Sequence, residues 1–381
     1  MKIDDKTSHN SPSLRFPEFT GEWEESTIGK EFDLYSGNTP SRLNKEHFKG
    51  KVNWISSGEL KNHYIYSSKE QISEDAAKNL KLLPKGTFVI AIYGLEAEGV
   101  RGTGSITQEP STISQACMAF IPQGDIENEF LYSWYKKHGE VIGVRYAQGT
   151  KQQNLSYDIL EKFKIAYPSI KEQKKLNKFI ALLDERIAVQ NRLIDRLQSL
   201  MIGIRHRIIN EAKGKIVCLC EVSDIYQPQT ISSADLTETG YPVYGANGII
   251  GHYTSYNHEA EQVCITCRGN TCGGVNYTKS KSWITGNAMV VNVDRYQNIV
   301  SKRYLYHYLS NCDFNSIISG SGQPQIVRAP LAKFKIILPT VMQQYKIAHC
   351  LDVIQNKINV NSNILNLLIR QKQYLLRKMF I

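Results

Sequence analysis

The chain has 381 residues, of which 22% are charged and 41% hydrophobic, and its formal net charge is +10 with a pI near 9.0. This length allows two domains of ordinary size, each with its own core. The positive charge makes nucleic acid the first partner to consider and an anionic membrane the second. No apolar run approaches the roughly 18 residues of a membrane span. We expect a soluble, cytoplasmic protein whose polar residues 1–13 form a flexible tail.

The first mixed α/β domain is expected over residues 14–167. Apolar strands are predicted at TFVIAIY from Thr87 and at ACMAFIP from Ala116, followed by a short helix at FLYSWYKK from Phe130. Gly-rich and polar loops such as ISSGELKN and GVRGTGS separate these elements. Because recognition residues usually lie on loops of a rigid scaffold, these loops are the candidate binding segments.

Residues 168–212 are predicted to form one long helix. After Pro168, apolar residues alternate spacings of four and three, which is the pattern of a heptad seam. A helix over residues 171–210 would be roughly 60 Å long and too apolar on one face to stand alone. The seam positions are Leu176, Ile180, Leu183, Ile187, Gln190, Ile194 and Leu197.

A second mixed α/β domain is expected over residues 213–338. Strands are predicted at QVCIT from Gln262 and at AMVVNV from Ala288, and a helix at RYLYHYLS from Arg303. The intervening loops include YGANGIIGHY and CRGNTCGG. The order of elements therefore resembles that of the first domain.

Residues 339–381 are predicted to form another long helix with the same seam. We expect the two helices to pair as an antiparallel coiled coil about a pseudo-two-fold axis, which gives an α+β fold class. Gln190 and Asn361, the polar seam residues near the midpoints, are predicted to touch and fix the register; alternatively, each is partly exposed at its own position. The second seam comprises Ile347, Leu351, Ile354, Ile358, Asn361, Leu365 and Leu368.

Both long helices belong to an internal repeat. QxxLxxxxLEKFKIAYPSxxEQxK from Gln152 returns as QxxIxxxPLAKFKIILPTxxQQYK from Gln323, and the offset of 171 holds without a gap from 149–209 to 320–380. Near the start of the two fronts matching residues are 191 positions apart, and near the end of the fronts they are 174 positions apart. The second copy is therefore about 20 residues shorter. Each half has a variable, nearly neutral front and a constant back, whose helices hold the excess positive charge.

The variable loops carry side chains that could read DNA. Arg and Lys read guanine in the major groove, Asn and Gln read adenine, and Ser and Thr read bases more loosely. The alternative for each residue is an ordinary solvated position, since contacts to phosphate and solvent outnumber contacts to bases. The candidates are Ser56, Ser57, Lys61, Arg101 and Thr103 in the first front, and Arg268, Asn270, Thr271, Lys279 and Lys281 in the second.

Three cysteines of the second front have a spacing that could suit a metal site. Cys264, Cys267 and Cys272 form a CxxCxxxxC pattern, for which His252 or His258 could supply a fourth zinc ligand. However, Cys264 lies inside an apolar strand pattern, where cysteine behaves as a small hydrophobe. We therefore expect no metal site.

Catalytic motifs are equally unpromising. No HExxH, GxSxG, kinase, Walker or adenine-methyltransferase pattern occurs, and the Gly-rich segments lack the spacing of phosphate-binding loops. The scattered carboxylates Glu96, Glu98 and Glu109 are expected at the surface. The chain is predicted to recognise a partner and to have no catalytic residues of its own.

These features together resemble the specificity subunits of type I restriction-modification enzymes. The resemblance rests on LRFPEFTGEWEESTIGK near the N-terminus, on the two QxxLxxxxLxKFKIxxPxxxEQxK segments with their heptad helices, and on VNWISSGELKN and YPVYGANGIIGHY. It extends over essentially the whole chain from Leu14.

The resemblance implies a non-catalytic subunit that supplies DNA sequence recognition. Each front would be a target-recognition domain for one half of a bipartite, asymmetric site, and the paired helices would set the fixed spacer. The helices would also dock two modification subunits, which bind S-adenosylmethionine and methylate adenine, and two motor-nuclease subunits that use ATP and magnesium would complete the restriction enzyme. This chain itself would carry no cofactor.

Three alternatives remain open from the residues alone: a stand-alone enzyme, a coiled-coil adaptor that never touches DNA, and a DNA-binding protein without a restriction partner. Because the fronts are nearly neutral, the isolated chain is expected to bind DNA weakly. The basic helices could face DNA or could be solvated flanks of the coiled coil.

Overall fold

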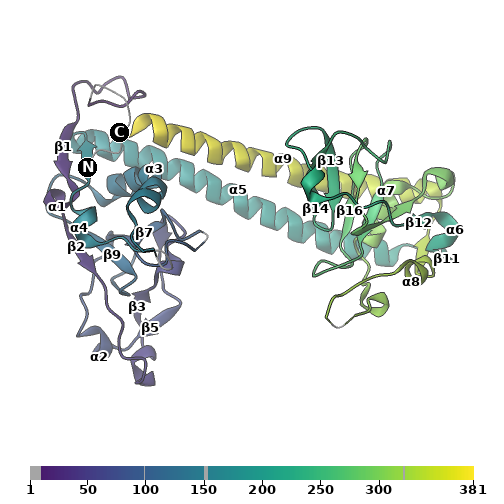
Figure 1. Ribbon diagram of the computed structural model, residues 1–381, viewed down its shortest axis with the longest axis horizontal. Coiled ribbons are helices and arrows are strands. Elements are labelled where there is room, and N and C mark those ends of the chain that lie inside the picture. The colour runs from purple at the N-terminus through teal and green to yellow at the C-terminus, as the bar shows by residue number, and fades with distance from the viewer. Residues whose placement is uncertain (1–9, 98, 150–152, 321) are drawn as a thin grey trace. The chain divides into compact units, whose positions relative to one another are not determined.

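The computed structural model describes residues 10–97, 99–149, 153–320 and 322–381. Gln152 at the start of the first repeat copy, Glu98, and residues 1–9 of the expected tail lie outside the described residues. The chain divides into two compact units (Figure 1). Unit 1 comprises residues 1–191 and 364–381, and unit 2 comprises residues 192–363. Each unit contains one mixed α/β domain and a part of both long helices.

The mixed domain of unit 1 has a five-stranded sheet of order β2-β9-β6-β7-β4 and a three-stranded sheet of order β5-β3-β8. Its strands are β1 (Glu24–Thr27), β2 (Phe32–Ser36), β3 (Val52–Ile55), β4 (Tyr64–Ile65), β5 (Glu70–Ile72), β6 (Phe88–Ala91), β7 (Gly104–Thr107), β8 (Ser111–Ile113), β9 (Cys117–Pro122) and β10 (Lys164–Tyr167). Its helices are α1 (Ile28–Glu31), α2 (Glu74–Ala77), α3 (Asn128–Tyr146) and α4 (Tyr157–Leu160), with 3-10 turns η1 (Lys45–Phe48) and η2 (Ser57–Glu59).

The core of this domain forms where the two most apolar strands meet a helix. The strands predicted from Thr87 and Ala116 are confirmed as β6 and β9, which pair antiparallel with Phe88 opposite Phe120. All four residues of β6 are buried. The ring of Phe88 makes edge contacts with Tyr132 and Tyr135 of α3, so aromatic packing holds the helix on the sheet.

Helix α3 is longer than the sequence predicted. The expected helix was short, from Phe130, but α3 spans Asn128–Tyr146 and contains Gly139 and Gly143. These glycines are required by close packing: a Cβ at Gly139 would lie 2.8 Å from the Tyr135 ring, and one at Gly143 would lie 2.4 Å from the Arg101 side chain. Tertiary packing therefore outweighs the low helix propensity of glycine here.

The mixed domain of unit 2 has a four-stranded sheet of order β12-β18-β15-β16 and a three-stranded sheet of order β14-β13-β17. Its strands are β11 (Lys215–Cys218), β12 (Asp224–Tyr226), β13 (Tyr241–Gly245), β14 (Gly248–Tyr253), β15 (Val263–Thr266), β16 (Val275–Tyr277), β17 (Trp283–Ile284), β18 (Ala288–Asn292) and β19 (Lys335–Leu338). Its short helices are α6 (Leu219–Val222), α7 (Lys302–Leu309) and α8 (Arg328–Ala332), with 3-10 turns η3 (Ser233–Asp235), η4 (Asp294–Tyr296) and η5 (Asn315–Ile317). The predicted strands from Gln262 and Ala288 and the helix from Arg303 are confirmed as β15, β18 and α7.

The two mixed domains share one topology. The order β12-β18-β15-β16 repeats β2-β9-β6-β7, and β14-β13-β17 repeats β5-β3-β8. In both small sheets the central strand has one antiparallel and one parallel neighbour. In β1–β10 Glu24 lies opposite Tyr167, and in β11–β19 Lys215 lies opposite Leu338. These positions differ by 191 and 171, which are two of the offsets in the sequence repeat. The duplication therefore extends through the variable fronts.

Much of the length difference between the fronts lies in one connection. In unit 1, residues 56–69 join β3 to β5 and include η2 and β4. In unit 2, residues 246–247 join the corresponding strands β13 and β14 as a tight hairpin, with Gly248 at φ 93°. Ser56, Ser57 and Lys61 thus lie on a segment that is specific to unit 1.

The long helices are α5 (Ile170–Glu211) and α9 (Val341–Met379), close to the predicted bounds. In unit 1, Leu176, Ile180 and Leu183 of α5 share a buried cluster with Leu376 and Met379 of α9. Asp184 of α5 forms an ion pair with Lys372 of α9. The early part of α5 therefore packs against the late part of α9 within this unit.

In unit 2, Met201 of α5 clusters with Leu351 and Ile358 of α9. All fourteen predicted seam residues are buried or half-buried. The predicted contact between Gln190 and Asn361 stays a prediction; both side chains are half-buried, and Asn361 Nδ2 donates to the Lys357 carbonyl at 2.7 Å.

In the part of the chain that the structure describes, no helix combines the length and the apolar character required to cross a lipid bilayer.

Candidate nucleic-acid interface

The loop between β15 and β16 presents three of the predicted residues to solvent. Arg268, Asn270 and Thr271 are all exposed, and the turn is shaped by Gly269 at φ 83° and Gly273 at φ 91°, a backbone conformation that favours glycine. The Thr271 carbonyl accepts from the Gly274 backbone N–H at 2.9 Å. The turn is therefore ordered by its own backbone, and its side chains are directed outward.

The loop between β16 and β17 carries Lys279 and Lys281, and both are exposed. The backbone N–H of Lys279 donates to the Tyr244 hydroxyl at 3.1 Å. Lys281 has φ 50° and lies with its ammonium 3.8 Å from a Glu259 carboxylate oxygen. Both lysines are thus on a loop anchored to the small sheet, and exposed ion pairs of this kind contribute little stability.

In unit 1, Ser56 and Ser57 begin the segment that unit 2 lacks. The backbone N–H and the hydroxyl of Ser56 donate to Glu59 Oε2 at 2.9 and 2.7 Å, a capping arrangement that orders η2. Lys61 is exposed beside a shallow hollow of about 370 Å³. Of these three residues, Lys61 is the most available to a ligand.

Arg101 and Thr103 are engaged within the protein. Arg101 Nη2 donates to Gln153 Oε1 at 2.9 Å, and Nη1 lies 3.6 Å from Glu140. The Thr103 hydroxyl donates to the Val100 carbonyl at 2.6 Å. These contacts give both residues a structural role in the β6–β7 loop, which corresponds to the β15–β16 loop of unit 2.

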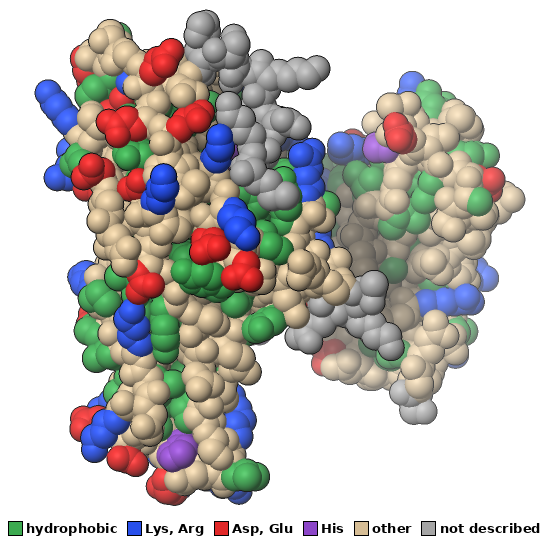
Figure 2. Space-filling view, turned by 60° about the vertical axis from the view of Figure 1, so that its left-hand side comes forward, with side chains coloured by type: hydrophobic (Ala, Val, Ile, Leu, Met, Phe, Trp, Pro, Cys, Tyr) green, Lys and Arg blue, Asp and Glu red, His purple; other side chains and the backbone are tan. Residues whose placement is uncertain are grey.

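Charge on unit 1 is mixed. Figure 2 shows Lys and Arg interspersed with Asp and Glu on the face of unit 1 turned to the viewer, with no field of one sign. The pattern agrees with the nearly neutral first front, where 20 basic residues oppose 22 acidic ones over positions 1–170. A general attraction to phosphate is therefore weak on this unit.

Sequence reasoning missed a buried charge cluster in unit 1. The His63 ring lies between Tyr64 and Tyr132, with centroid distances of 4.1 and 3.9 Å. Its Nδ1 lies 3.0 Å from Asp184, and its Nε2 lies 2.9 Å from Glu129. Burial by itself lowers the pKa of His63, but the hydrogen bonds to Asp184 and Glu129 outweigh it, and the pKa is raised. This cluster ties the 56–69 segment to α3 and α5.

Two lysines complete the cluster. Lys372 pairs with Asp184, and Lys136 lies with its ammonium 5.6 Å from the Tyr132 ring centroid. Burial and the positive charge of Lys372 lower the pKa of Lys136 to about 8. Lys372 lies four residues after Leu368, where the heptad spacing places the next seam residue of α9. Its pairing with Asp184 explains why a charged residue is tolerated there. No local pattern in the sequence distinguishes these residues, because they come from four separate segments.

Unit 2 has a different cation beside Tyr306, the residue that corresponds to Tyr132. The Arg303 guanidinium lies 4.3 Å from the Tyr277 ring centroid and 5.2 Å from that of Tyr306. Its Nε donates to Asp352 of α9 at 3.0 Å, and His307 Nε2 lies 2.7 Å from the same carboxylate. Burial lowers the pKa of His307, so the charge pair here is Arg303 with Asp352.

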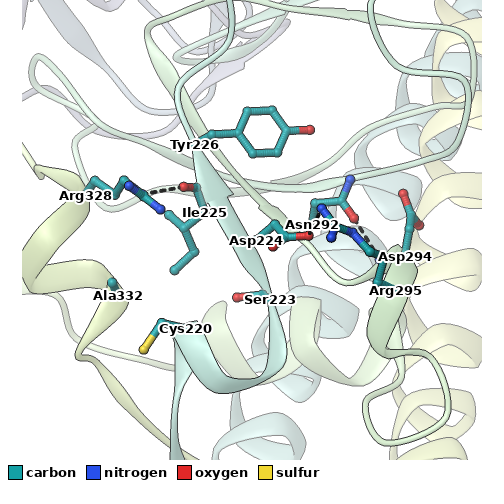
Figure 3. A pocket seen from close by; sticks show the side chains of 10 residues that line it. All are labelled: Cys220, Ser223, Asp224, Ile225, Tyr226, Asn292, Asp294, Arg295, Arg328 and Ala332. Carbon is teal, nitrogen blue, oxygen red and sulfur yellow. Dashed lines mark hydrogen bonds and ion pairs between the residues drawn. The ribbon is translucent and has the colours of Figure 1, made fainter.

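A hollow of about 480 Å³ lies beside the edge strand β12 in unit 2 (Figure 3). On one side Arg328 Nε donates to the Ile225 carbonyl at 2.7 Å, and on the other Arg295 pairs with Asp224 at 3.2 Å. The charged groups are thus engaged with one another or with the backbone. The hollow brings together no nucleophile with an activating base.

The cysteine pattern is divided between two clusters of unit 2. Cys264 packs with Tyr244 and Ile284, whereas Cys267 packs with Met289 and Phe314. The two side chains therefore pack in different apolar clusters beside β15. Among the residues that the structure describes, no group of three His, Cys, Asp or Glu could hold a metal ion.

Comparison with known proteins agrees with this duplicated architecture. The model of the type I restriction modification DNA specificity domain matches twice, over residues 20–199 and 213–370. The EcoprrI type I specificity subunit of Escherichia coli is 26% identical over 359 residues, covering 85% of this chain and 86% of that protein. The MjaIX specificity subunit of Methanocaldococcus jannaschii is 28% identical over 185 residues, covering 46% and 42%.

Solved structures show the same fold over almost the whole chain. The S subunit of a type I restriction-modification system from M. genitalium superposes with a TM-score of 0.66 at 18% identity, covering 97% of this chain and 99% of that one. A chain from a study of type I complex assembly and conformational transition gives 0.57 at 17% identity, covering 94% and 97%. The two family matches cover both mixed domains and most of both long helices, and the chain belongs to the type I restriction-modification DNA specificity family.

Proposed function

We propose that this specificity subunit reads a bipartite, asymmetric DNA site, one half with each mixed domain. The observation that carries the proposal is that two domains of one topology present different loops: the 56–69 segment in unit 1 is replaced by the 246–247 turn in unit 2. Equivalent scaffolds with unequal loops suit two half-sites of different sequence. The target-recognition domains would span residues 14–167 and 213–338.

Base contacts in the second half-site are proposed for the exposed loop residues of unit 2. Arg268 is suited to guanine and Asn270 to adenine, while Thr271 can contact either type of base pair. Lys279 and Lys281 suit phosphate or guanine. In unit 1 the proposed contacts come from Ser56, Ser57 and Lys61, and Arg101 and Thr103 would act by shaping the β6–β7 loop.

The spacer between the half-sites is proposed to be set by α5 and α9, paired as an antiparallel coiled coil through residues 168–212 and 339–381. Half-sites on one face of the duplex lie about 34 Å, or one helical turn, apart. The contact between Gln190 and Asn361 would fix the register of the coil.

Partner docking is proposed on a second apolar stripe of each long helix. Three of the large hydrophobic residues that are exposed on α5 have a counterpart 171 positions later in α9 that is hydrophobic and exposed as well. Both sets have successive spacings of seven and four, which place side chains along one helix face. They are Leu182, Val189 and Leu193 in α5, with exposed fractions of 55%, 48% and 39%, and Val353, Val360 and Ile364 in α9, with 54%, 57% and 38%.

A repeated stripe fits two copies of one partner. We propose that the partners are two modification subunits, which would bring S-adenosylmethionine, and that two motor-nuclease subunits using ATP and magnesium join the assembly. The specificity subunit itself would act without a cofactor and without a catalytic residue.

The test is methylation mapping in cells that express this chain with its modification subunit. We expect one methylated motif with two unlike half-sites and a constant gap, and exchange of residues 213–338 for the corresponding region of a relative should change one half only. Deletion of one heptad from both α5 and α9 should alter the gap. Methylation without a bipartite motif, or an unchanged gap after the deletion, would contradict the proposal.

A further inference from the structure

A hollow of about 560 Å³ in unit 2 lies where the β16–β17 loop, α7 and α9 meet. Lys279 and Ser280 line it from the loop, Arg303 from α7, and Asn356 and Asn359 from α9. Lys279, Ser280, Asn356 and Asn359 are exposed. The hollow thus combines two cations with hydroxyl and amide donors from one loop and two helices.

The corresponding place in unit 1 is filled by the chain itself. Tyr306 of unit 2 corresponds to Tyr132, since both follow the offset of 174 that relates α7 to α3. In unit 1 the His63 ring stacks on Tyr132 at 3.9 Å. His63 belongs to the 56–69 segment, which unit 2 replaces with residues 246–247. In unit 2 the connection between β13 and β14 is therefore short, and the hollow is left open.

The charge of the surrounding residues also changes between the two units. The two groups that bond to the His63 ring in unit 1 are acidic, as suits a cation, whereas the matching unit 2 residues are neutral or basic. Glu129 is replaced by Arg303 and Asp184 by Gln355, and the exposed Glu185 that follows Asp184 is replaced by Asn356. In unit 2 the carboxylate that lines the hollow is Glu261, and Asp352, which is not among the lining residues, accepts a hydrogen bond from Arg303 Nε. The unit 2 hollow is suited to an oxyanion.

We infer that this hollow seats one backbone phosphate of the bound DNA. The Lys279 ammonium would supply the charge, and the Ser280 hydroxyl and the amides of Asn356 and Asn359 would donate hydrogen bonds. DNA is favoured over an acidic protein because Lys279 lies on the same loop as Lys281, a proposed DNA contact, and phosphate contacts normally accompany base readout. The inference rests on the proposed function and adds to it an electrostatic asymmetry: unit 2 binds this phosphate and unit 1 does not.

The experiment measures how DNA affinity depends on salt for the full chain assembled with its modification subunits, using a duplex of any sequence. A plot of the logarithm of the DNA association constant against the logarithm of the salt concentration has a negative slope. The variant Lys279→Gln is expected to make this slope less steep by about 0.9, the value for one phosphate contact. Lys335→Gln, which removes the same charge from an exposed position of β19 outside the hollow, should leave the slope unchanged.

A second variant keeps the test independent of Lys279. Asn356→Glu places into the exposed α9 surface the carboxylate that unit 1 carries at Glu185, and it should weaken DNA binding about tenfold at low salt. An unchanged slope for Lys279→Gln would overturn the inference. If Asn356→Glu binds DNA normally but no longer binds the modification subunit, the hollow is assigned to a protein carboxylate. That result would also overturn the inference. If cells that carry either of these variants still methylate an unaltered bipartite motif, the proposed function stands although the phosphate inference fails.

Discussion

Gln173 and Gln344 make the same three hydrogen bonds, each within its own unit. Gln173 Nε2 donates to the carbonyls of Pro168 and Asp125, both at 2.9 Å, and its Oε1 accepts from the Glu127 backbone N–H at 3.0 Å. The side chain joins the start of α5 to the segment that leads into α3. Since Gln173 has no exposed surface, these bonds are shielded from water.

In unit 2, Gln344 Nε2 donates to the carbonyls of Pro339 and Ile299 at 2.9 Å, and its Oε1 accepts from the Ser301 backbone N–H at 2.7 Å. Gln344 is also fully buried. One acceptor is a proline carbonyl in both units, and the other two partners differ in residue type but occupy corresponding positions. The glutamine of the repeated EQ and QQ motifs therefore fixes how each mixed domain joins its long helix.

Replacing Gln173 with leucine should destabilise unit 1 by about 3 kcal/mol, because the Glu127 N–H and two carbonyls lose their buried partner. Urea unfolding measures the change. Gln198→Leu, at an exposed position of α5, serves as the matched control and should alter stability by less than about 0.5 kcal/mol. Equal effects of the two substitutions would contradict the assigned role.

Stability should depend on pH through His63. Its pKa in the folded protein is raised above the ordinary value of 6.5, so its stabilising contribution is fully present below pH 6.5 and is lost as the pH rises through the folded-state pKa. The stability difference between the parent and His63→Gln should therefore be larger at pH 6 than at pH 9. Denaturant unfolding at both pH values provides the comparison, and a difference that is constant with pH would exclude the ion-pair role.

His307 should show the opposite sign. Burial lowers its pKa, so the folded state favours the neutral ring, and its contribution is present above pH 6.5 and is lost as the pH falls through the lowered pKa. Relative to the parent, His307→Gln should therefore be less destabilising at acidic pH than at neutral pH. The same unfolding series tests this, and parallel pH profiles for the His63 and His307 variants would be inconsistent with the two environments described above.

The two loop arginines should differ in what they control. Arg268→Ala should relax recognition in one half-site, with a loss of about 1–3 kcal/mol in discrimination and little change in stability. Arg101→Ala should instead cost about 1–2 kcal/mol in stability through its lost bonds to Gln153 and its packing on Gly143. Methylation mapping and thermal unfolding of both variants distinguish the roles; a recognition defect confined to Arg101→Ala would reverse the assignment.

The second apolar stripe predicts a separable defect in assembly. Val189→Glu and Val360→Glu should each weaken association with the modification subunit by about tenfold or more, since a charge would be placed in an apolar interface. Their thermal stability should stay close to that of the parent because both positions are exposed. Sedimentation or calorimetric titration gives the affinity, and normal assembly of both variants would rule out this face as the docking surface.

The amino-acid sequence by itself was sufficient to identify the duplication, the strands β6, β9, β15 and β18, and the two long helices. Their patterns are local: a run of apolar residues or a heptad seam expresses burial within a few turns or strands. The repeat also led from the sequence to the family, because matched motifs at a constant offset recur over most of the chain.

Only the tertiary structure showed which polar side chains are committed to the fold. Arg101 and Arg268 both lie in Gly-rich loops, yet the first is held by Gln153 and packs on Gly143, while the second is exposed. Likewise, His63, Glu129, Asp184 and Lys372 lie far apart in the chain and meet only when unit 1 folds. Partners distant in sequence leave no local pattern, so their pairing, and the open hollow where unit 2 lacks His63, depended on the three-dimensional arrangement.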